Sequence, residues 1–443
     1  MQSSSVIIDL YHSVLYALSI IFERVVYKQI VNYLESLNIL YDFQFGFRTN
    51  YSTEYAVSYL ANKVSEALER REHTLSVFLD LSKAFDTVNH DILCDKLYFY
   101  GFRGISQKWF RSYLTDRTQY VNYLSTNSEI LKITCGVPQG SILGPLLFLI
   151  YINDLAYVSQ EIFCLLFADD TSILLSDKDM DTLKRKTINV LNVIMKWFQT
   201  NRLSVNIEKT NYMIYRSRNN NTNTDDFSLD INGTELQRVE TFKFLGIWFD
   251  ELLSWKQHIL YISKKLSKIV GILKKVRSSF GTNILIQLYY ALVYPYFIYC
   301  YTTWAITYKS SLDIMVKLQK KIIRIITFSG YNAHTNVLFH RFKILSFQSL
   351  DLYLTGLFMY KVKYHLVPNV IRTLFTDIVN IHDYNTRQRN NFYSRSFRTN
   401  LGKFSITSHG PFIWKSIPVY IQKASSIYTF KKYIKQQLLD NME

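Results

Sequence analysis

Residues 163–175 read Phe-Cys-Leu-Leu-Phe-Ala-Asp-Asp-Thr-Ser-Ile-Leu-Leu, so that two adjacent carboxylates, Asp169 and Asp170, separate two apolar runs. Short apolar runs on both sides of a polar step are typical of two buried strands joined by a tight turn. The pattern therefore predicts a β-hairpin that presents both carboxylates at its tip. Because unpaired charge is unfavourable beside buried segments, a ligand role is favoured over a structural one.

A third acid, Asp80, ends another predicted buried strand, Leu75-Ser-Val-Phe-Leu-Asp80. Three carboxylates on neighbouring strands could hold two divalent cations. Two such cations, about 3.5–4 Å apart, can activate a 3′-hydroxyl and stabilise leaving pyrophosphate. Mg²⁺ suits such a site because it takes a few carboxylates together with substrate phosphates. This arrangement of acids therefore fits nucleotidyl transfer.

A second acidic pair, Asp225-Asp226, follows the polar run Asn219-Asn-Asn-Thr-Asn-Thr. This composition predicts a solvated linker over 216–226, without a ligand role.

The net charge of the chain indicates the class of molecule that it binds. The 443 residues carry 51 Lys and Arg against 35 Asp and Glu, a formal charge of +16, and are long enough for two or three domains. Nucleic acid, with its negative phosphates, is the partner that such a positive charge favours.

The sequence favours an intracellular protein without a zinc site. Four cysteines, at 94, 135, 164 and 300, form no C-x-x-C pair, so neither a disulfide framework nor a zinc site is expected. Asp9 and His12 interrupt the N-terminal apolar stretch, which argues against a signal peptide. The sequence does not decide between nucleus and cytoplasm.

The uncharged segment 278–308 is long enough to cross a bilayer. Gln287 and Pro295 interrupt it, and its tyrosines are spread along its length rather than gathered at the ends. A buried helical hairpin is therefore predicted, with no membrane span.

Local patterns predict the remaining elements. Helices are expected at 11–40, 52–70, about 180–200, 264–276 and 311–326. Strands are expected at 203–215 and 242–250, and a hairpin at 230–234 through its Asn-Gly turn. Glycines and a proline at 136–145 predict a close-approach turn that opens an apolar helix.

In the order of its sequence blocks, the chain resembles the reverse transcriptase of a non-LTR (LINE-type) retrotransposon of the jockey-like group. The blocks that carry the resemblance are Ile21-Phe-Glu-Arg-Val-Val, Gln44-Phe-Gly-Phe-Arg, Phe78-Leu-Asp-Leu-Ser-Lys-Ala-Phe-Asp-Thr-Val-Asn-His-Asp, Gly136-Val-Pro-Gln-Gly-Ser-Ile-Leu-Gly-Pro, Phe167-Ala-Asp-Asp-Thr, the Lys209 segment and Phe244-Leu-Gly-Ile. Seven ordered blocks are far more specific than one acidic pair.

The resemblance implies an α+β right-hand polymerase. Fingers and a palm with an antiparallel sheet would occupy 1–250, a helical thumb 251–330, and a mostly helical, basic and aromatic region 331–443. That last region, which includes His382-Asp-Tyr-Asn-Thr-Arg387, suits RNA contact through phosphate pairing and base stacking. In the thumb, the lysines at 264, 268 and 275 lie roughly opposite an apolar face, as expected for a helix that contacts duplex phosphate.

The resemblance also implies the roles of individual residues. Asp80, Asp169 and Asp170 would bind Mg²⁺, or Mn²⁺ in its place, together with the carbonyl of Leu81. A second group would contact the incoming dNTP: Arg48 at the triphosphate, Phe85 against the sugar and Gln139 near the template pair. Phe85 would exclude a ribose 2′-hydroxyl.

Three further residues have implied roles. Lys209 would be the proton donor to pyrophosphate, and Leu245 with Gly246 would form the primer grip. Asp86 and Asp154 lie in matching blocks, where a helix cap or an ion pair is expected of each.

Two functions remain open at this point. One is an RNA-directed DNA polymerase that extends a DNA primer or target DNA on template RNA. The other is a truncated relic that only binds nucleic acid, because the chain begins inside the expected fingers and without the endonuclease that the resemblance places upstream. A transcriptase of intron-maturase type fits the palm but not the C-terminal block. The sequence indicates no oligomeric state.

Overall fold

The computed structural model describes residues 3–124, 126–217, 227–381 and 391–441, with side chains from residue 18 onward. Asp225, Asp226 and the block 382–387 lie outside these residues, as does most of the linker predicted at 216–226. The predictions for them stay predictions.

A five-stranded sheet in the order β11-β8-β1-β7-β6 forms the palm. β1 is antiparallel to β7 and β8, β6 is antiparallel to β7, and β11 is parallel to β8. The strands are β1 (His73–Leu79), β6 (Phe163–Phe167), β7 (Asp170–Asp177), β8 (Asn211–Tyr215) and β11 (Gln237–Arg238). The predicted hairpin and the predicted strand before Asp80 are thereby confirmed.

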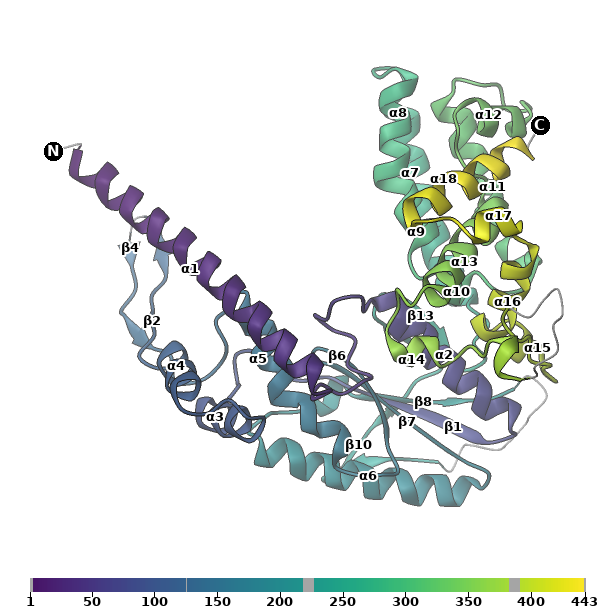
Figure 1. The fold of residues 1–443 in the computed structure, drawn as a ribbon. Coiled ribbons are helices and arrows are strands. Elements are labelled where there is room, and N and C mark those ends of the chain that lie inside the picture. The colour runs from purple at the N-terminus through teal and green to yellow at the C-terminus, as the bar shows by residue number, and fades with distance from the viewer. Residues whose placement is uncertain (1–2, 125, 218–226, 382–390, 442–443) are drawn as a thin grey trace.

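Alternation along β1 divides the core between the two faces of the sheet. Leu75 and Val77 belong to one core, with residues of α3 (His90–Phe99), α5 (Leu143–Ile152) and α6 (Met180–Thr200). Phe78 belongs to a second core, with α2 (Thr53–Glu69) and the helical part of the chain. Figure 1 shows α6 beneath the sheet and α2 above it.

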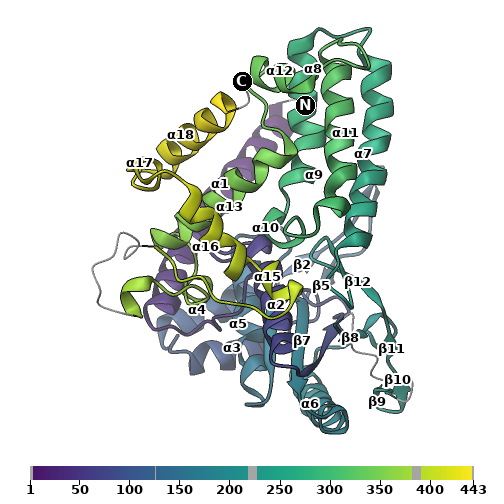
Figure 2. The same ribbon diagram turned by 90° about the vertical axis from the view of Figure 1, so that its right-hand side faces the viewer.

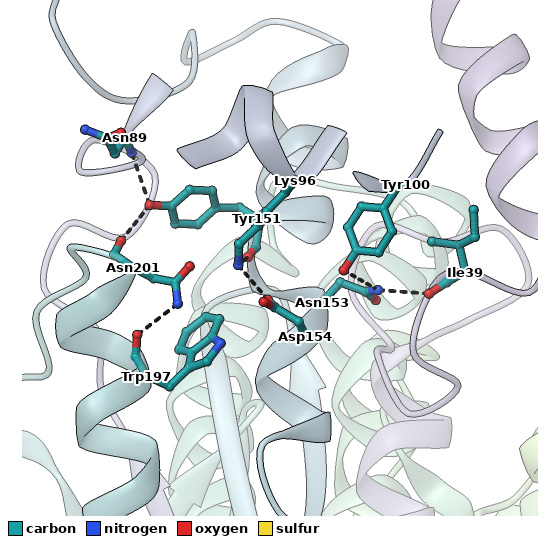
Figure 3. Close-up of polar contacts among 9 residues, drawn as sticks. All are labelled: Ile39, Asn89, Lys96, Tyr100, Tyr151, Asn153, Asp154, Trp197 and Asn201. Carbon is teal, nitrogen blue, oxygen red and sulfur yellow. Dashed lines mark hydrogen bonds and ion pairs between the residues drawn. The ribbon is translucent and has the colours of Figure 1, made fainter. Parts of the chain in front are cut away.

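A polar network joins the helices beneath the sheet (Figure 3). Lys96 on α3 donates to Asp154 at 2.6 Å, so the ion pair expected at Asp154 is confirmed. Tyr151 donates its hydroxyl to the carbonyl of Asn201, and Asn153 donates its amide to the carbonyl of Ile39. These bonds connect α3, α5, the end of α6 and the loop after α1. They also give the polar groups of this region the partners that buried polar groups need.

The fingers side of the molecule is built from one long helix and a small β extension. α1 lies against α5, and its N-terminal part extends away from the other elements (Figure 1). The elements are α1 (Ser3–Ser36), α4 (Ile105–Leu114), β2 (Thr118–Gln119), β3 (Asn122–Tyr123), β4 (Thr126–Asn127), β5 (Leu131–Lys132) and the 3₁₀ turn Asn153–Tyr157.

Helices form the thumb, in which α7 and α11 pack side by side (Figure 2). The predicted apolar face of α7 is buried at Leu266, Ile269, Val270 and Leu273. The uncharged segment 278–308 folds as short helices, and no helix among the described residues is long and apolar enough to cross a membrane. The elements are α7 (Lys256–Val276), α8 (Thr282–Leu288), a π turn (Tyr289–Val293), α9 (Tyr294–Ile298), α10 (Tyr301–Trp304) and α11 (Lys309–Ile326).

The C-terminal region shares the core of α2 and the thumb. α13 packs against α16 and α18, and Glu69 at the end of α2 accepts bonds from the backbone N–H groups of Arg398 and Thr399. Its elements are α12 (Thr335–Arg341), α13 (Phe347–Lys363), α14 (Asn369–Arg372), a 3₁₀ turn (Ile378–Asn380), α15 (Asn400–Lys403), α16 (Ile406–Ser416), α17 (Val419–Gln422) and α18 (Ile427–Asp440).

Two predicted strands were wrong in extent. Within 203–215 only β8 is a strand, and it follows a 3₁₀ turn, Ile207–Lys209; the residues before that turn form a single bridge, between Val205 and Leu81. The segment 242–250 is a hairpin, β12 (Thr241–Phe244) and β13 (Ile247–Asp250). The Asn-Gly hairpin is confirmed as β9 (Asp230–Ile231) and β10 (Thr234–Glu235).

Buried polar side chains hold the junction of palm and thumb. The carboxylate of Asp250 accepts bonds from the N–H groups of Ser254 and Trp255, and so fixes the turn that starts α7. On α7, His258 is 2% exposed, and its Nδ1 accepts a bond from the N–H of Trp248. Burial, and then the charge of Lys243, lower the pKa of His258 to about 4.

The acid stability of the chain should therefore depend on His258. Between pH 6.5 and 4 the unfolded chain binds a proton that the folded chain does not, so folded stability falls as pH falls, by up to about 1.4 kcal/mol per pH unit. His258→Asn, measured by urea unfolding across this window, should flatten the fall. His365→Asn, at an exposed histidine, is the control and should not. Parallel pH profiles for wild type and His258→Asn would contradict the assignment.

Candidate active site

The strand register brings the predicted acids together. Leu79 on β1 lies opposite Thr171 on β7, so the next position places Asp80 opposite Asp170. Phe167 pairs with Asp170, which leaves Ala168 and Asp169 as a two-residue turn. The tip of the hairpin therefore lies beside the end of β1, as the sequence predicted.

The charges of Asp169 and Asp80 act on the carboxylate of Asp170. Asp170 is an exposed residue, yet protein packed around its carboxylate reduces its hydration. That desolvation first, and then the charges of Asp169 and Asp80, raise the pKa of Asp170 to about 6. The site is therefore a concentration of negative charge that a cation would relieve.

The donor chemistry of this site fits a divalent cation of the hard, oxygen-binding class. Among the described residues no three His, Cys, Asp or Glu side chains form a ready-made metal cage. Mg²⁺ does not need one, since it binds through one or two carboxylates and substrate phosphates. Asp80, Asp169 and Asp170 would supply the protein oxygens.

A residue that the sequence analysis did not single out, Gln44, holds the hairpin turn. Its Oε1 accepts hydrogen bonds from the N–H groups of Gly46 and Ala168, at 2.9 and 3.0 Å, and the side chain is 2% exposed. Phe45 donates its N–H to the carbonyl of Leu166, which continues the contact along β6. The segment 43–46 thus clamps the strand and turn that carry Asp169.

The close approach explains the glycine at 46. A Cβ there would lie 2.4 Å from the backbone nitrogen of Ala168, and so would displace the turn. Ala168 itself has φ +55, a left-handed conformation that a non-glycine residue adopts only when its surroundings enforce it. Its hydrogen bond to Gln44 supplies that enforcement.

The turn at 136–140 is bound to the loop after Asp80. Gln139 donates its amide to Asp86 at 2.6 Å, so the cap or ion pair expected at Asp86 was wrong. Gly136, with φ +88, leaves no room for a Cβ against the backbone of Asp86. Asp86 therefore orients the side chain that was predicted to meet the nucleotide.

Phe85 is half-buried between two other rings. The centroid of its ring lies 4.5 Å from that of Phe148 on α5 and 6.3 Å from that of Phe47, which follows the clamp segment 43–46. The loop of Phe85 also pairs with Val137, whose N–H donates to the Phe85 carbonyl. A predicted sugar contact is compatible with this partly open position.

The guanidinium of Arg48 contacts other residues of its own loop. Nη1 donates to the carbonyl of Tyr41 at 2.9 Å, and the group stacks 4.1 Å from the centroid of Tyr51. Its contact with a triphosphate stays a prediction.

Lys209 is exposed at the end of the 3₁₀ turn, and not on a strand as predicted. The same short segment contacts the acidic site: Asn206 donates its N–H to the carbonyl of Asp80, and Thr210 accepts from the Asp80 N–H. These bonds hold Lys209 near the end of β1.

Comparison with known proteins bears on this arrangement directly. The sequence profile described as "Reverse transcriptase (RNA-dependent DNA polymerase)" matches residues 16–249, more than half of the chain and the whole site. The chain belongs to this reverse transcriptase family. The α+β palm with its helical C-terminal half is the polymerase fold expected from the sequence.

Relatives from retrotransposons support the same assignment. The chain is 26% identical over 337 residues to "RNA-directed DNA polymerase from mobile element jockey" of Drosophila melanogaster, covering 73% of this chain and 36% of that protein. It is 29% identical over 342 residues to "Probable RNA-directed DNA polymerase from transposon BS" of the same species, covering 74% and 37%. The chain thus spans little more than a third of the length of these relatives.

Among solved structures, telomerase from Candida albicans, in complex with a fragment of telomeric RNA, is similar with a TM-score of 0.39 and 14% identity. The match covers 70% of this chain and 55% of that one.

The predicted primer grip of this reverse transcriptase chain is a strained turn. Leu245 and Gly246 both have positive φ, +46 and +82. Tyr299, from the thumb, donates its hydroxyl to the carbonyl of Leu245 at 2.7 Å, and its ring lies 3.2 Å from where a Cβ on Gly246 would stand. The sequence analysis missed Tyr299, which has no local signal for this contact.

Glu23 is a third residue that the sequence analysis missed, although it lies in a block that carries the resemblance. Its carboxylate accepts bonds from the N–H of Ile142 at 2.8 Å and from the hydroxyl of Tyr113 at 3.0 Å. Glu23 therefore connects α1 to the start of α5, next to the turn that carries Gln139.

Because Gln44 clamps the turn that carries Asp169, we expect Gln44→Ala to slow nucleotide incorporation as well as to lower the free energy of unfolding. Two buried N–H groups would lose their acceptor, at about 1–3 kcal/mol each. A displacement of about 1 Å at a reacting group can slow reaction about 100-fold. Single-turnover incorporation and urea unfolding would measure the two effects.

Gln319→Ala is the matched control for that variant. Gln319 is also a buried glutamine, and its side chain makes three hydrogen bonds, but it lies in the thumb. Gln319→Ala should lower the free energy of unfolding by a comparable amount, but it should not slow nucleotide incorporation to the same extent. Equal slowing in both variants would mean that Gln44 is structural only.

Proposed function

We propose that this chain is an RNA-directed DNA polymerase of a jockey-like non-LTR retrotransposon. The supporting observation is the register of β1 and β7, which sets Asp80 opposite Asp170 beside the Ala168–Asp169 turn. The family assignment supports the same conclusion. The proposed substrates are template RNA, a DNA primer or target DNA with a free 3′-hydroxyl, and dNTPs.

The reaction joins the primer 3′-oxygen to the α-phosphorus of a dNTP and breaks the bond to pyrophosphate. Bound at the three carboxylates, Mg²⁺, or Mn²⁺ in its place, would supply charge neutralisation and a more acidic 3′-hydroxyl. Asp80, Asp169 and Asp170 would hold this ion, with the Leu81 carbonyl as a further proposed ligand. Lys209 is the proposed proton donor to the leaving pyrophosphate.

The remaining residues position the substrates. Gln139, oriented by Asp86, is proposed to contact the nascent pair, and Arg48 the triphosphate. The Leu245–Gly246 turn is proposed as the primer grip, which Tyr299 supports from the thumb. The net charge of +16 favours nucleic-acid phosphates in general.

Primer extension tests the proposal. A DNA primer annealed to an RNA template should be extended with dNTPs and Mg²⁺ or Mn²⁺. Asp169→Asn should reduce incorporation about 1,000-fold, because the loss of several kcal/mol of charge stabilisation corresponds to that factor. No incorporation above the variant, with wild type folded by circular dichroism, would refute the polymerase, and RNA binding retained in that sample would indicate a relic that only binds nucleic acid.

The proposed contact of Phe85 with the sugar has its own test. Phe85→Val should raise incorporation of ribonucleotides relative to deoxynucleotides about 100-fold, because the ring no longer meets the 2′-hydroxyl. Phe47→Leu, which removes the neighbouring ring without placing a β-branched residue at the positive φ of position 47, should leave the ratio unchanged. An unchanged ratio in Phe85→Val would remove Phe85 from sugar selection.

A further inference from the structure

The C-terminal region carries an unusual run of charge. Residues 384–439 contain ten Lys and Arg and no Asp or Glu. Much of this region packs inward against α13 and α2, so its buried side is apolar. Arg395 and Arg398 contact Glu66 and Glu69 of α2. Exposed lysines of the described part of this region lie at 403, 415, 423, 431 and 432, without acids of their own segment to neutralise them.

α18 concentrates this charge together with aromatic rings. Phe430 and Ile434 are fully buried on one side of the helix. On the other side Tyr428, Lys431 and Lys432 are exposed and follow the i, i+3, i+4 spacing of one helical stripe. The side chain of Tyr428 is 76% exposed, so most of its ring is open to a ligand.

α17 extends the same surface. Tyr420, 65% exposed, lies with its ring centroid 6.4 Å from that of Tyr433 on α18, and Lys423 at the end of α17 is exposed. We call these exposed side chains the α17–α18 surface: Tyr420, Lys423, Tyr428, Lys431, Lys432 and Tyr433. Three tyrosines among three lysines, without an acid, favour a polyanion that also offers flat apolar faces.

The surface is separate from the helices expected to hold the primer–template duplex. α18 packs on α13, whereas α7 packs on α11, and Figure 2 shows α18 and α7 on opposite sides of the helical half. A ligand on α17–α18 would therefore not compete with a duplex on α7.

We propose that the α17–α18 surface binds single-stranded RNA, with Tyr420, Tyr428 and Tyr433 stacking on unpaired bases and Lys423, Lys431 and Lys432 pairing with phosphates. Unpaired bases expose the faces that tyrosines stack on, whereas a duplex hides them. The inference rests on the proposed function, because template RNA outside the copied duplex is the single strand that such an enzyme handles.

The test measures binding to the full chain by fluorescence anisotropy, with a labelled, unstructured RNA oligonucleotide. Saturating unlabelled, blunt-ended RNA–DNA hybrid is present to occupy the palm. The stacking variant, Tyr428→Ala with Tyr433→Ala, should weaken binding about ten-fold or more. Tyr428→Phe with Tyr433→Phe should bind as wild type, because the rings remain.

Salt dependence tests the lysines. Lys431→Ala with Lys432→Ala should make the log–log slope of affinity against KCl shallower by about 1.4, the effect of two lost phosphate contacts on a single strand. Tyr98→Ala with Lys178→Ala, at exposed residues on α3 and after β7, should change neither affinity nor slope. Crosslinks from a 4-thiouridine RNA should map to residues 419–440.

Extension of a recessed primer on the same variants separates this inference from the polymerase itself. Wild-type extension rates with weakened RNA binding would support the surface. Unchanged RNA affinity in both double variants, or equal affinity of the surface for double-stranded RNA, would overturn it even if extension is robust. Unchanged affinity together with capture of a protein by this surface would assign it to a protein partner instead.

Discussion

The antiparallel pairing of β1 with β7 is the constraint on which the site depends. Side chains alternate along a strand, so a slip of one residue would move Asp80 away from Asp170 and also turn Leu75 and Val77 out of their core. Because both faces of the sheet are buried, the packing of the core fixes the register. The position of the acids is therefore a consequence of hydrophobic burial on β1 and β7.

Two strained turns are held by residues that lie far from them in the sequence. Ala168 and Leu245 both have positive φ although neither is glycine. Gln44 bonds the N–H of the first, and Tyr299 bonds the carbonyl of the second. Such conformations persist only where surrounding contacts enforce them. The fingers loop and the thumb are thus part of the palm geometry, and not separate attachments to it.

Local pattern was sufficient where one element buries one face. It located β1, the β6–β7 hairpin, α6 and the apolar face of α7, since periodicity records burial directly. It failed at 203–215 and 242–250. There, the apolar residues on both sides of each turn also fit one continuous strand, although Gly246 is a residue type that marks turns. In the sequence, Gln44 is marked only by its place in one of the blocks that resemble the family.

The sequence by itself determined the chemistry: three acids, their order within the family blocks, a large positive charge and an acid-free C-terminal stretch. Only the tertiary structure decided which groups hold that chemistry in place. Gln44 and Ala168 are 124 residues apart and Tyr299 and Leu245 are 54 apart. A hydrogen bond depends on distance and angle in space, and so leaves no periodic trace along the chain.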